Sequence, residues 1–197
     1  MLHNSISKPK QSIQLNNWFL QGKDIINSEK RIKHLKEVFG DEESFKKLDP
    51  EKVVYSVQSY LPVKEGTPGG LYFGTTTIQP GKVGNEYFMT RGHFHANLDR
   101  GEYYWGVQGE GMLILMDKNR NTWGEIMSPG SLHYIGVNIA HRVANMGSTA
   151  LIFGACWPSD AGHNYEETEQ KGFSSRLVEI NHKPQLIDSE LPLWKKQ

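Results

Sequence analysis

Hydrophobic and polar positions alternate in short runs along the central part of the chain. From Val53 to about Pro158, stretches rich in aromatic and β-branched residues are separated by turns that contain glycine, proline or asparagine. The runs read VVYSVQSYLPV, GGLYFGTTTIQPG, EYFMTRGHFH, EYYWGVQGEGMLILMD, TWGEIMSPGSLHYIGV and HRVANMGSTALIFGACW. Short strands at this spacing, without helical periods between them, predict an all-β sandwich or barrel.

The regions on either side of this β-rich part are more polar. Within the first 50 residues, Asn27–Gly40 has a helical period, and a second short helix is expected over Asp41–Leu48. We expect residues 1–52 to be a helical or extended segment that packs on a β-barrel of residues 53–197, giving one domain overall. The C-terminal extension of that barrel carries a further strand candidate, SSRLVEI.

Composition and charge narrow the classes of partner. The 197 residues include 22 Lys and Arg and 22 Asp and Glu, so no overall basic charge favours nucleic acid or an anionic membrane. No apolar run reaches the roughly 20 residues that a membrane helix needs, and MLHNSISKPKQSIQ lacks the apolar core of a signal peptide. Cys156 is the single cysteine and is interpreted as a core residue. We therefore expect a cytoplasmic protein.

The candidate chemistry lies in the stretch TRGHFHANLDRGE, residues 90–102. His93 and His95 are two positions apart, so on a strand both imidazoles would point to the same face. Glu102 begins the next aromatic run, and a hairpin-like link could return it beside them; His141 is a fourth candidate. Three imidazoles and one carboxylate suit a first-row divalent metal with open coordination positions. Two strand histidines alone would more often be ordinary polar residues.

The wider pattern resembles the two motifs of the cupin superfamily. Glu102 is followed seven residues later by Gly109, and His141 is followed by Asn145. The long gap between His95 and Glu102, together with QPGKVGNEYF upstream and CWPSDAGHNY downstream, is similar to the cupin-type phosphoglucose isomerases over roughly residues 50 to 175. Two departures are Arg91, where lysine is commoner, and IGVNIAH, which lacks the usual prolines.

This resemblance implies a cupin double-stranded β-helix, a jelly-roll-like barrel, that interconverts glucose 6-phosphate and fructose 6-phosphate. It implies His93, His95, Glu102 and His141 as metal ligands. The expected ion is iron(II), with manganese, nickel or zinc as alternatives, and the expected assembly is a homodimer. The family's substrate contacts correspond here to Thr76, Thr90, Gly92, Tyr104, His163, Tyr165 and Tyr55. Nucleic acid and membrane partners are not expected.

Individual roles follow from chemistry. Glu102 is the candidate proton carrier of a cis-enediol route, with a metal-assisted hydride shift as the rival. His163 is a candidate for ring opening or for contacting the sugar. Arg91, with Thr90 and the Gly92 amide, is a candidate phosphate site, although Arg91 on its own is equally a solvated surface charge. Tyr104 shares the strand parity of Glu102, so it is expected to face the cavity, and Tyr103 the other side.

Three other functions compete with the isomerase hypothesis. A metal-dependent cupin dioxygenase would use the same four ligands but would consume oxygen. A non-catalytic sugar-phosphate-binding cupin would often lack one of the ligands. An epimerase for nucleotide sugars would usually rely on a histidine–aspartate pair without metal.

Overall fold

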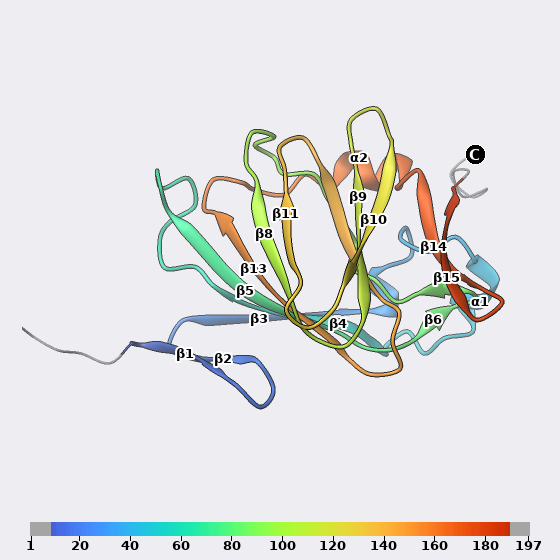
Figure 1. Ribbon diagram of the computed structural model, residues 1–197, viewed down its shortest axis with the longest axis horizontal. Helices are drawn as coiled ribbons and strands as arrows, with labels where there is room; N and C mark the ends of the chain where they lie inside the picture. The colour runs from blue at the N-terminus through green and yellow to red at the C-terminus, as the bar shows by residue number, and fades with distance from the viewer. Residues whose placement is uncertain (1–8, 190–197) are drawn as a thin grey trace, which may run out of the picture.

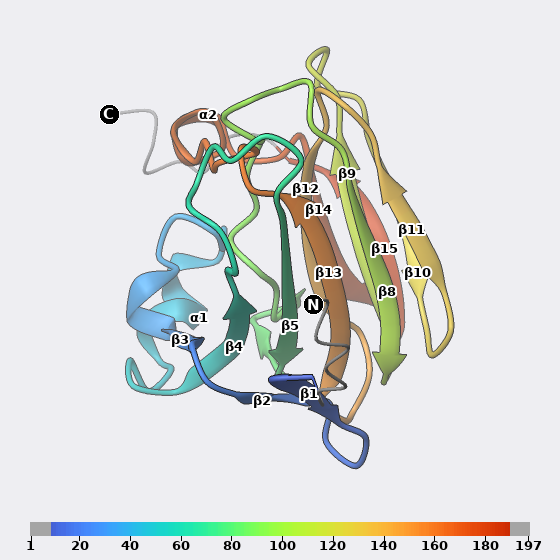
Figure 2. The same ribbon diagram turned by 90° about the vertical axis from the view of Figure 1, so that its left-hand side faces the viewer.

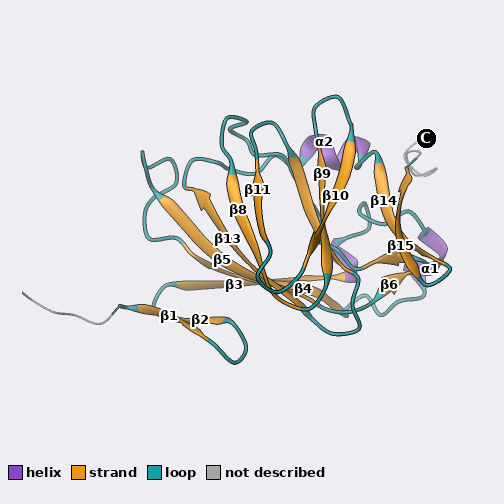
Figure 3. Cartoon of the chain, in the orientation of Figure 1, coloured by secondary structure: helices purple, strands orange, loops and turns teal. Residues whose placement is uncertain are grey.

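The computed structural model describes residues 9–189, and within this range the side chains at 167 and 169 are not described. Antiparallel strands are the main regular secondary structure of this part of the chain (Figures 1 and 3). The helices found there are short: η1 (Ile32–His34), α1 (Glu42–Lys46) and α2 (Glu166–Lys171). None of them is long and apolar enough to cross a membrane. The predicted all-β class is confirmed.

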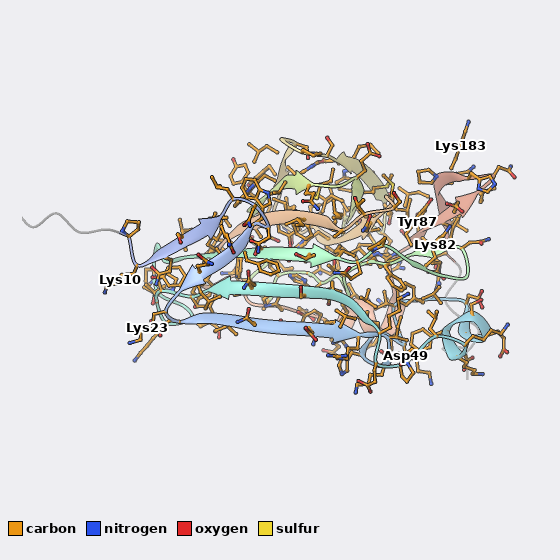
Figure 4. All side chains as sticks on the ribbon, turned by 90° about the horizontal axis from the view of Figure 1, so that it is seen from below. Lys10, Lys23, Asp49, Lys82, Tyr87 and Lys183 are labelled. Atoms are coloured by element: carbon orange, nitrogen blue, oxygen red, sulfur yellow. The ribbon has the colours of Figure 1, made fainter. Side chains whose placement is uncertain are left out.

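The largest sheet has six strands, all paired antiparallel with their neighbours. In spatial order they are β11 (Leu132–Ile135), β8 (Glu102–Gln108), β13 (Leu151–Pro158), β5 (Leu71–Ile78), β4 (Val53–Tyr60) and β3 (Ile25–Arg31). Alternate residues of each strand point to the inside of the molecule. Figure 4 looks onto this sheet from below, where its strands run side by side.

A three-stranded sheet faces the inner side of the large one (Figure 2). Its strands are β10 (Thr122–Met127), β9 (Gly111–Met116) and β12 (Ala140–Asn145). The chain passes from β8 in the first sheet to β9 in the second through a tight turn at Gly109, whose positive φ of 80° favours glycine. The space between the sheets is filled by buried apolar side chains, among them Leu113, Val143 and Phe153. This arrangement fits the expected cupin fold.

Two smaller groups of strands complete the described part. The four-stranded group contains β15 (Lys183–Asp188), β14 (Ser175–Ile180), β7 (Glu86–Tyr87) and β6 (Lys82–Val83). The hairpin of β1 (Gln11–Gln14) and β2 (Phe19–Gly22) lies at the lower left of Figure 1. The predicted strand in SSRLVEI is thus confirmed as β14, and it pairs with a strand some 90 positions earlier in the chain through Val178 and Glu86.

The helix expected over Asn27–Gly40 is wrong in both halves, since no α-helix forms in this range. Residues 25–31 form strand β3, which pairs with the whole of β4, and only the single turn η1 follows it. Backbone hydrogen bonds offered by β4 outweigh the modest helical propensity of the segment, because tertiary context overrides a weak local preference. The apolar residues of the predicted helical face are nevertheless buried: Ile32, Leu35, Val38 and Phe39.

The shorter helix expected over Asp41–Leu48 is confirmed as α1. The Asp41 side chain accepts a hydrogen bond from the backbone N–H of Ser44 at 2.9 Å, which satisfies one of the free donors at the start of the helix. The division of the chain at residue 52 stays a prediction.

Candidate metal centre

The candidate centre begins with a segment that runs beside β12. After the two residues of β7, the segment forms single bridges instead of the long strand expected over EYFMTRGHFH. One of these bridges joins His93 and His141, whose backbone N–H and carbonyl groups exchange hydrogen bonds of 3.3 and 3.1 Å. Phe94 is fully buried, while the two flanking histidines point to the opposite side. Alternation of side chains therefore persists without a continuous strand.

Glu102 enters the centre as the first residue of β8. It is 5% exposed, and the loop of residues 96–101 brings it back beside the two histidines. One potential ligand atom from each of His93, His95, Glu102 and His141 lies within 4.8 Å of all the others. The four residues proposed as metal ligands from the sequence thus converge on one point between the two sheets.

Hydrogen bonds at the back of two imidazole rings orient them toward this point. Nδ1 of His95 lies 2.7 Å from the Arg100 carbonyl oxygen, and Nδ1 of His141 lies 3.3 Å from the Ile139 carbonyl oxygen. A carbonyl can only accept, so each Nδ1 carries the hydrogen, and Nε2 of each ring is turned toward the centre. Such backing hydrogen bonds are usual for histidines that bind metals.

The polar atoms at the centre lie close together but do not form good hydrogen bonds with one another. Nε2 of His141 lies 2.6 Å and Nε2 of His95 lies 3.3 Å from Oε1 of Glu102. Among the described residues, Glu102 Oε1 and His141 Nε2 make no hydrogen bond of acceptable geometry, although both atoms are buried. Buried polar atoms without partners are costly. A divalent cation would satisfy the lone pairs of all four side chains at once, so the residues fit a metal.

The electrostatics of the centre agree with this donor set. Burial alone would raise the pKa of the Glu102 carboxyl, but the neighbouring His141 and His95 bring it to about 2. Burial, reinforced by the neighbouring His141, lowers the pKa of His93 well below its usual value. An ionised carboxylate and neutral imidazoles are the forms that bind a metal. Calcium and magnesium, which prefer oxygen ligands alone, suit this set poorly.

A cavity of about 250 Å³ opens from the centre along the inner face of the large sheet. The structure places every candidate substrate contact on its wall: Tyr55, Thr76, Thr90, Arg91, Gly92, Tyr104, His163 and Tyr165. They come from β4, β5, β8 and two loops. The first and the last of them, Tyr55 and Tyr165, are 110 positions apart in the chain. Their common location makes joint binding of one small molecule possible, and their separate roles stay predictions.

A stack of rings covers one side of the centre. The ring of His163 lies 4.4 Å from that of His93 and is parallel to that of Tyr165, at 5.7 Å with an interplanar angle of 4°. The Arg91 guanidinium lies over the other ring of this stack, 4.9 Å from the centroid of Tyr165. A bridge between Phe94 and Asn164 holds the two contributing segments together. The stack therefore runs from the candidate metal ligand His93 to Arg91, which marks the cationic end of the cavity.

Two tyrosine hydroxyls on the cavity wall remain protonated near neutral pH. Burial raises the pKa of Tyr55 to about 12. Burial, together with the charge of Glu102 and a hydrogen bond to it, raises the pKa of Tyr104 well above its usual value. Both phenols can therefore donate hydrogen bonds to an anionic or oxygen-rich ligand. The expected parity of β8 is confirmed, because Tyr104 faces the cavity while Tyr103 is 49% exposed on the other side.

Sequence reasoning missed one cation of the cavity. Lys30 lines it from β3, directly opposite Tyr55 in the register of β3 and β4. The helical period of residues 27–40 predicts no strand here, and therefore no inward face that would carry Lys30. Alternation from Ser28 to Lys30, both of which line the cavity, was the signal that could have revealed it.

The remaining histidine of the β-rich part lies away from the metal centre. His133 is buried outside the cavity, and its ring nitrogens lie 2.7 Å from Glu125 Oε2 and 2.9 Å from Ser131 Oγ. Both nitrogens are thus occupied by local partners, which agrees with a structural role.

Two facing antiparallel sheets, with three histidines and one glutamate gathered between them, define a protein of the cupin class with a candidate metal site. The family described as glucose-6-phosphate isomerase (GPI) has a model that matches residues 29–189. The chain belongs to this glucose-6-phosphate isomerase family, a family of enzymes, and the resemblance seen in the sequence is confirmed.

Individual relatives carry the same name. The glucose-6-phosphate isomerase of Thermococcus kodakarensis is 40% identical over 85% of this chain and 87% of its own length. That of Pyrococcus furiosus is 40% identical over 86% of this chain and 88% of its own length. Among solved structures, oxalate decarboxylase from Bacillus subtilis has a TM-score of 0.43 and 17% identity, covering 55% of this chain and 26% of that one.

Proposed function

We propose that this protein interconverts glucose 6-phosphate and fructose 6-phosphate in a metal-dependent reaction within the described cavity. The names of its relatives support the substrate pair. The observation that carries the metal dependence is the contact between Glu102 Oε1 and His141 Nε2, two buried atoms 2.6 Å apart that form no proper hydrogen bond. His93, His95, Glu102 and His141 would hold the cation. Iron(II) is the proposed ion, with manganese, nickel or zinc as alternatives.

The chemistry requires a proton to move between two neighbouring carbons. A bound divalent cation would act as a Lewis acid toward the oxygens on C1 and C2 of the open-chain sugar. Glu102 takes the proton from C2 of glucose 6-phosphate and returns it to C1, while the hydroxyl proton of O2 is transferred to O1, through a cis-enediol. Ionised Glu102 is the form that is able to accept this proton. The reverse sequence converts fructose 6-phosphate.

The phosphate group is proposed to bind at the cationic end of the cavity. Arg91 and Lys30 supply positive charge there, and Thr76 and Tyr55 supply hydroxyl groups on neighbouring strands. Thr90 accepts a hydrogen bond from the Val143 N–H at 3.0 Å, so its own hydroxyl hydrogen remains able to donate. A dianionic phosphate is recognised well by such a combination of charge and directed donors.

The conformation at Gly92 belongs to the same phosphate site. Its φ is +79°, a left-handed conformation that favours glycine, and it turns the backbone between Arg91 and His93. We propose that the Gly92 amide donates to the phosphate.

The stacked rings of His163 and Tyr165 are proposed to bind the sugar and to assist the opening of its ring. His163 lines the cavity beside His93 and is exposed to solvent, so it can reach a ligand that enters from outside. We assign it to ring opening of the cyclic sugar, with Tyr165 and Tyr104 as contacts to sugar hydroxyls. The parallel contact between His163 and Tyr165 restricts the orientation of the imidazole.

A cytoplasmic homodimer is proposed as the working form. The outer face of β8 and β11 carries large apolar side chains in contact with solvent: Tyr103 is 49% exposed, Leu132 68% and Tyr134 58%. Tyr103 and Tyr134 pair directly across these strands, with ring centroids 5.2 Å apart. Adjacent exposed apolar residues of this kind favour contact with a second copy. Sedimentation equilibrium of the wild type and of a Leu132→Asp variant tests this assembly.

The experiment that tests the activity is fructose 6-phosphate turnover, coupled to a glucose 6-phosphate dehydrogenase. It is run on the protein as purified, after chelation, and after addition of iron(II), manganese, nickel or zinc. Loss on chelation and recovery with metal are expected. Turnover that persists in fully chelated protein would contradict metal dependence. Consumption of oxygen without isomerisation would favour a dioxygenase.

The same assay in heavy water separates the two routes. The enediol route predicts deuterium at C2 of the glucose 6-phosphate product, because the proton on Glu102 can exchange with solvent. Complete retention of the substrate hydrogen at every extent of reaction would favour the hydride shift.

A further inference from the structure

Arg100 lies in the loop that makes the gap between His95 and Glu102 unusually long. Its backbone carbonyl accepts the hydrogen bond from Nδ1 of His95 at 2.7 Å, the bond that turns Nε2 of that ring toward the metal centre. Its side chain points elsewhere, to Asp160, which lies 60 positions later in the chain. One residue therefore touches both a candidate metal ligand and a distant loop.

The contact with Asp160 has the geometry of a paired, two-point interaction. Nε and Nη2 of Arg100 donate to the two carboxylate oxygens of Asp160 at 2.9 and 2.7 Å. The planar guanidinium fixes the direction as well as the distance of its partner in such an arrangement. The pair is about one third exposed, 37% for Arg100 and 30% for Asp160. Exposed pairs add little to global stability, so the consequence of this one is mainly positional.

Asp160 begins the segment that carries His163 and Tyr165 into the cavity. Next to it, the Ala161 carbonyl accepts a hydrogen bond from the Asn97 N–H at 2.9 Å, and further on Asn164 exchanges backbone hydrogen bonds with Phe94. The ion pair is thus the side-chain member of a set of contacts that binds the loop of residues 96–101 to the loop of residues 158–165. These loops hold the metal-ligand end and the sugar-contact end of the cavity, respectively.

We infer that Arg100 is a positioning residue for the isomerase reaction. Its carbonyl holds the His95 ring, its guanidinium holds the Asp160 loop, and together they fix the distance between the metal centre and His163. The inference rests on the proposed metal-dependent function.

The test compares Arg100→Met and Asp160→Asn with a matched control, Lys82→Met. Lys82 forms an ion pair with Glu179 at 2.6 Å, with similar exposures of 36% and 27%, outside the cavity wall. Three quantities are measured for each protein: the dissociation constant for cobalt(II) by competition with a chelator, the visible spectrum of the cobalt(II) form, and KM and kcat for fructose 6-phosphate.

Both variants of the Arg100–Asp160 pair are expected to bind cobalt(II) roughly tenfold more weakly, as is typical when the partner of a metal-binding histidine is disturbed. A shifted cobalt spectrum and a KM that rises more than kcat falls are also expected, whereas Lys82→Met leaves all three unchanged. In the double variant Arg100→Asp with Asp160→Arg, cobalt affinity should recover at least partly.

Wild-type values of cobalt affinity and KM in Arg100→Met would overturn the inference, even if its melting temperature falls. A double variant that is no better than the single ones would also count against it. If the wild-type protein itself binds no metal, the proposed function fails instead, and the two failures are therefore distinguishable.

Discussion

Nε2 of His141 lies 2.6 Å from Oε1 of Glu102, and these two residues belong to opposite sheets. His141 is in β12 of the three-stranded sheet and Glu102 begins β8 of the six-stranded sheet. Their side chains are 1% and 4% exposed, so the contact is closed to bulk water. A cation between them would link the two sheets, and ligand binding and fold stability are then coupled.

The first prediction concerns the carboxylate itself. Glu102→Gln keeps the shape of the side chain but removes its charge and its capacity to accept a proton. We expect kcat to fall at least about 100-fold, because general base catalysis usually contributes that much or more. Metal content, measured by atomic emission, should fall as well. Glu110→Gln, on an exposed turn, is the control and should behave as wild type. A Glu102→Gln protein with normal kcat would remove Glu102 from the mechanism.

A second prediction concerns the cations of the cavity. Arg91→Ala and Lys30→Ala should each raise KM for fructose 6-phosphate roughly tenfold or more, since a hydrogen bond to a charged group contributes about 1.5–3 kcal/mol. Steady-state kinetics should show a much smaller change in kcat. Lys23→Ala is the control, because Lys23 is exposed in the turn after β2, away from the cavity (Figure 4). An unchanged KM in either cavity variant would exclude that residue from phosphate binding.

The third prediction separates backbone strain from crowding at Gly92. Its φ of +79° matches the +78° of Gly66, but a Cβ atom on Gly92 would lie 2.7 Å from the Phe173 ring and 2.9 Å from Cβ of Arg142. A Cβ on Gly66 would meet nothing within 4 Å. Gly66→Ala should therefore lose about 1 kcal/mol from left-handed strain alone. Gly92→Ala should lose clearly more, about 2–3 kcal/mol or above, in urea unfolding. Equal losses of unfolding free energy in the two variants would show that Phe173 and Arg142 can move aside at little cost.

The fourth prediction is a loss of stability in alkali that involves Tyr87. Burial, assisted by the hydrogen bond to Glu179, raises the pKa of Tyr87 from 10 to about 12. Tyr87 lies near Lys82 at one end of the molecule (Figure 4). A pKa that is higher in the folded state gives stability that is fully present below pH 10 and is lost as the pH rises to about 12.

Urea unfolding at several pH values between 8 and 12 measures this effect. Tyr87→Phe should lower the free energy of unfolding near pH 8, because the variant lacks the hydrogen bond to Glu179. It should also make the decline of that free energy above pH 10 shallower. The same substitution at the exposed Tyr134 is the control and should leave the shape of the curve unchanged. If Tyr87→Phe follows the wild-type curve in parallel, another group causes the alkaline loss.

Much of the fold could be predicted from local patterns. Most of the runs between Val53 and Pro158 became strands, because alternating apolar and turn-forming residues are a signal that acts over a few positions. The run EYFMTRGHFH is the exception, since it forms a two-residue strand and single bridges. The same reasoning failed at residues 27–31. There the helical period was real, and its apolar residues Ile32 and Leu35 are buried, but pairing with β4 supplied backbone hydrogen bonds that no local pattern reports.

The sequence by itself determined the donor set of the site. His93 and His95 share a face because alternate residues of an extended chain do so, and the family motif added Glu102 and His141. Only the tertiary structure decided what surrounds them. Lys30, the His163 stack and the Arg100–Asp160 pair depend on which strands and loops become neighbours. Burial and strand pairing over the whole chain decide which segments become neighbours. The contacts between them therefore cannot be predicted from any single stretch of the sequence.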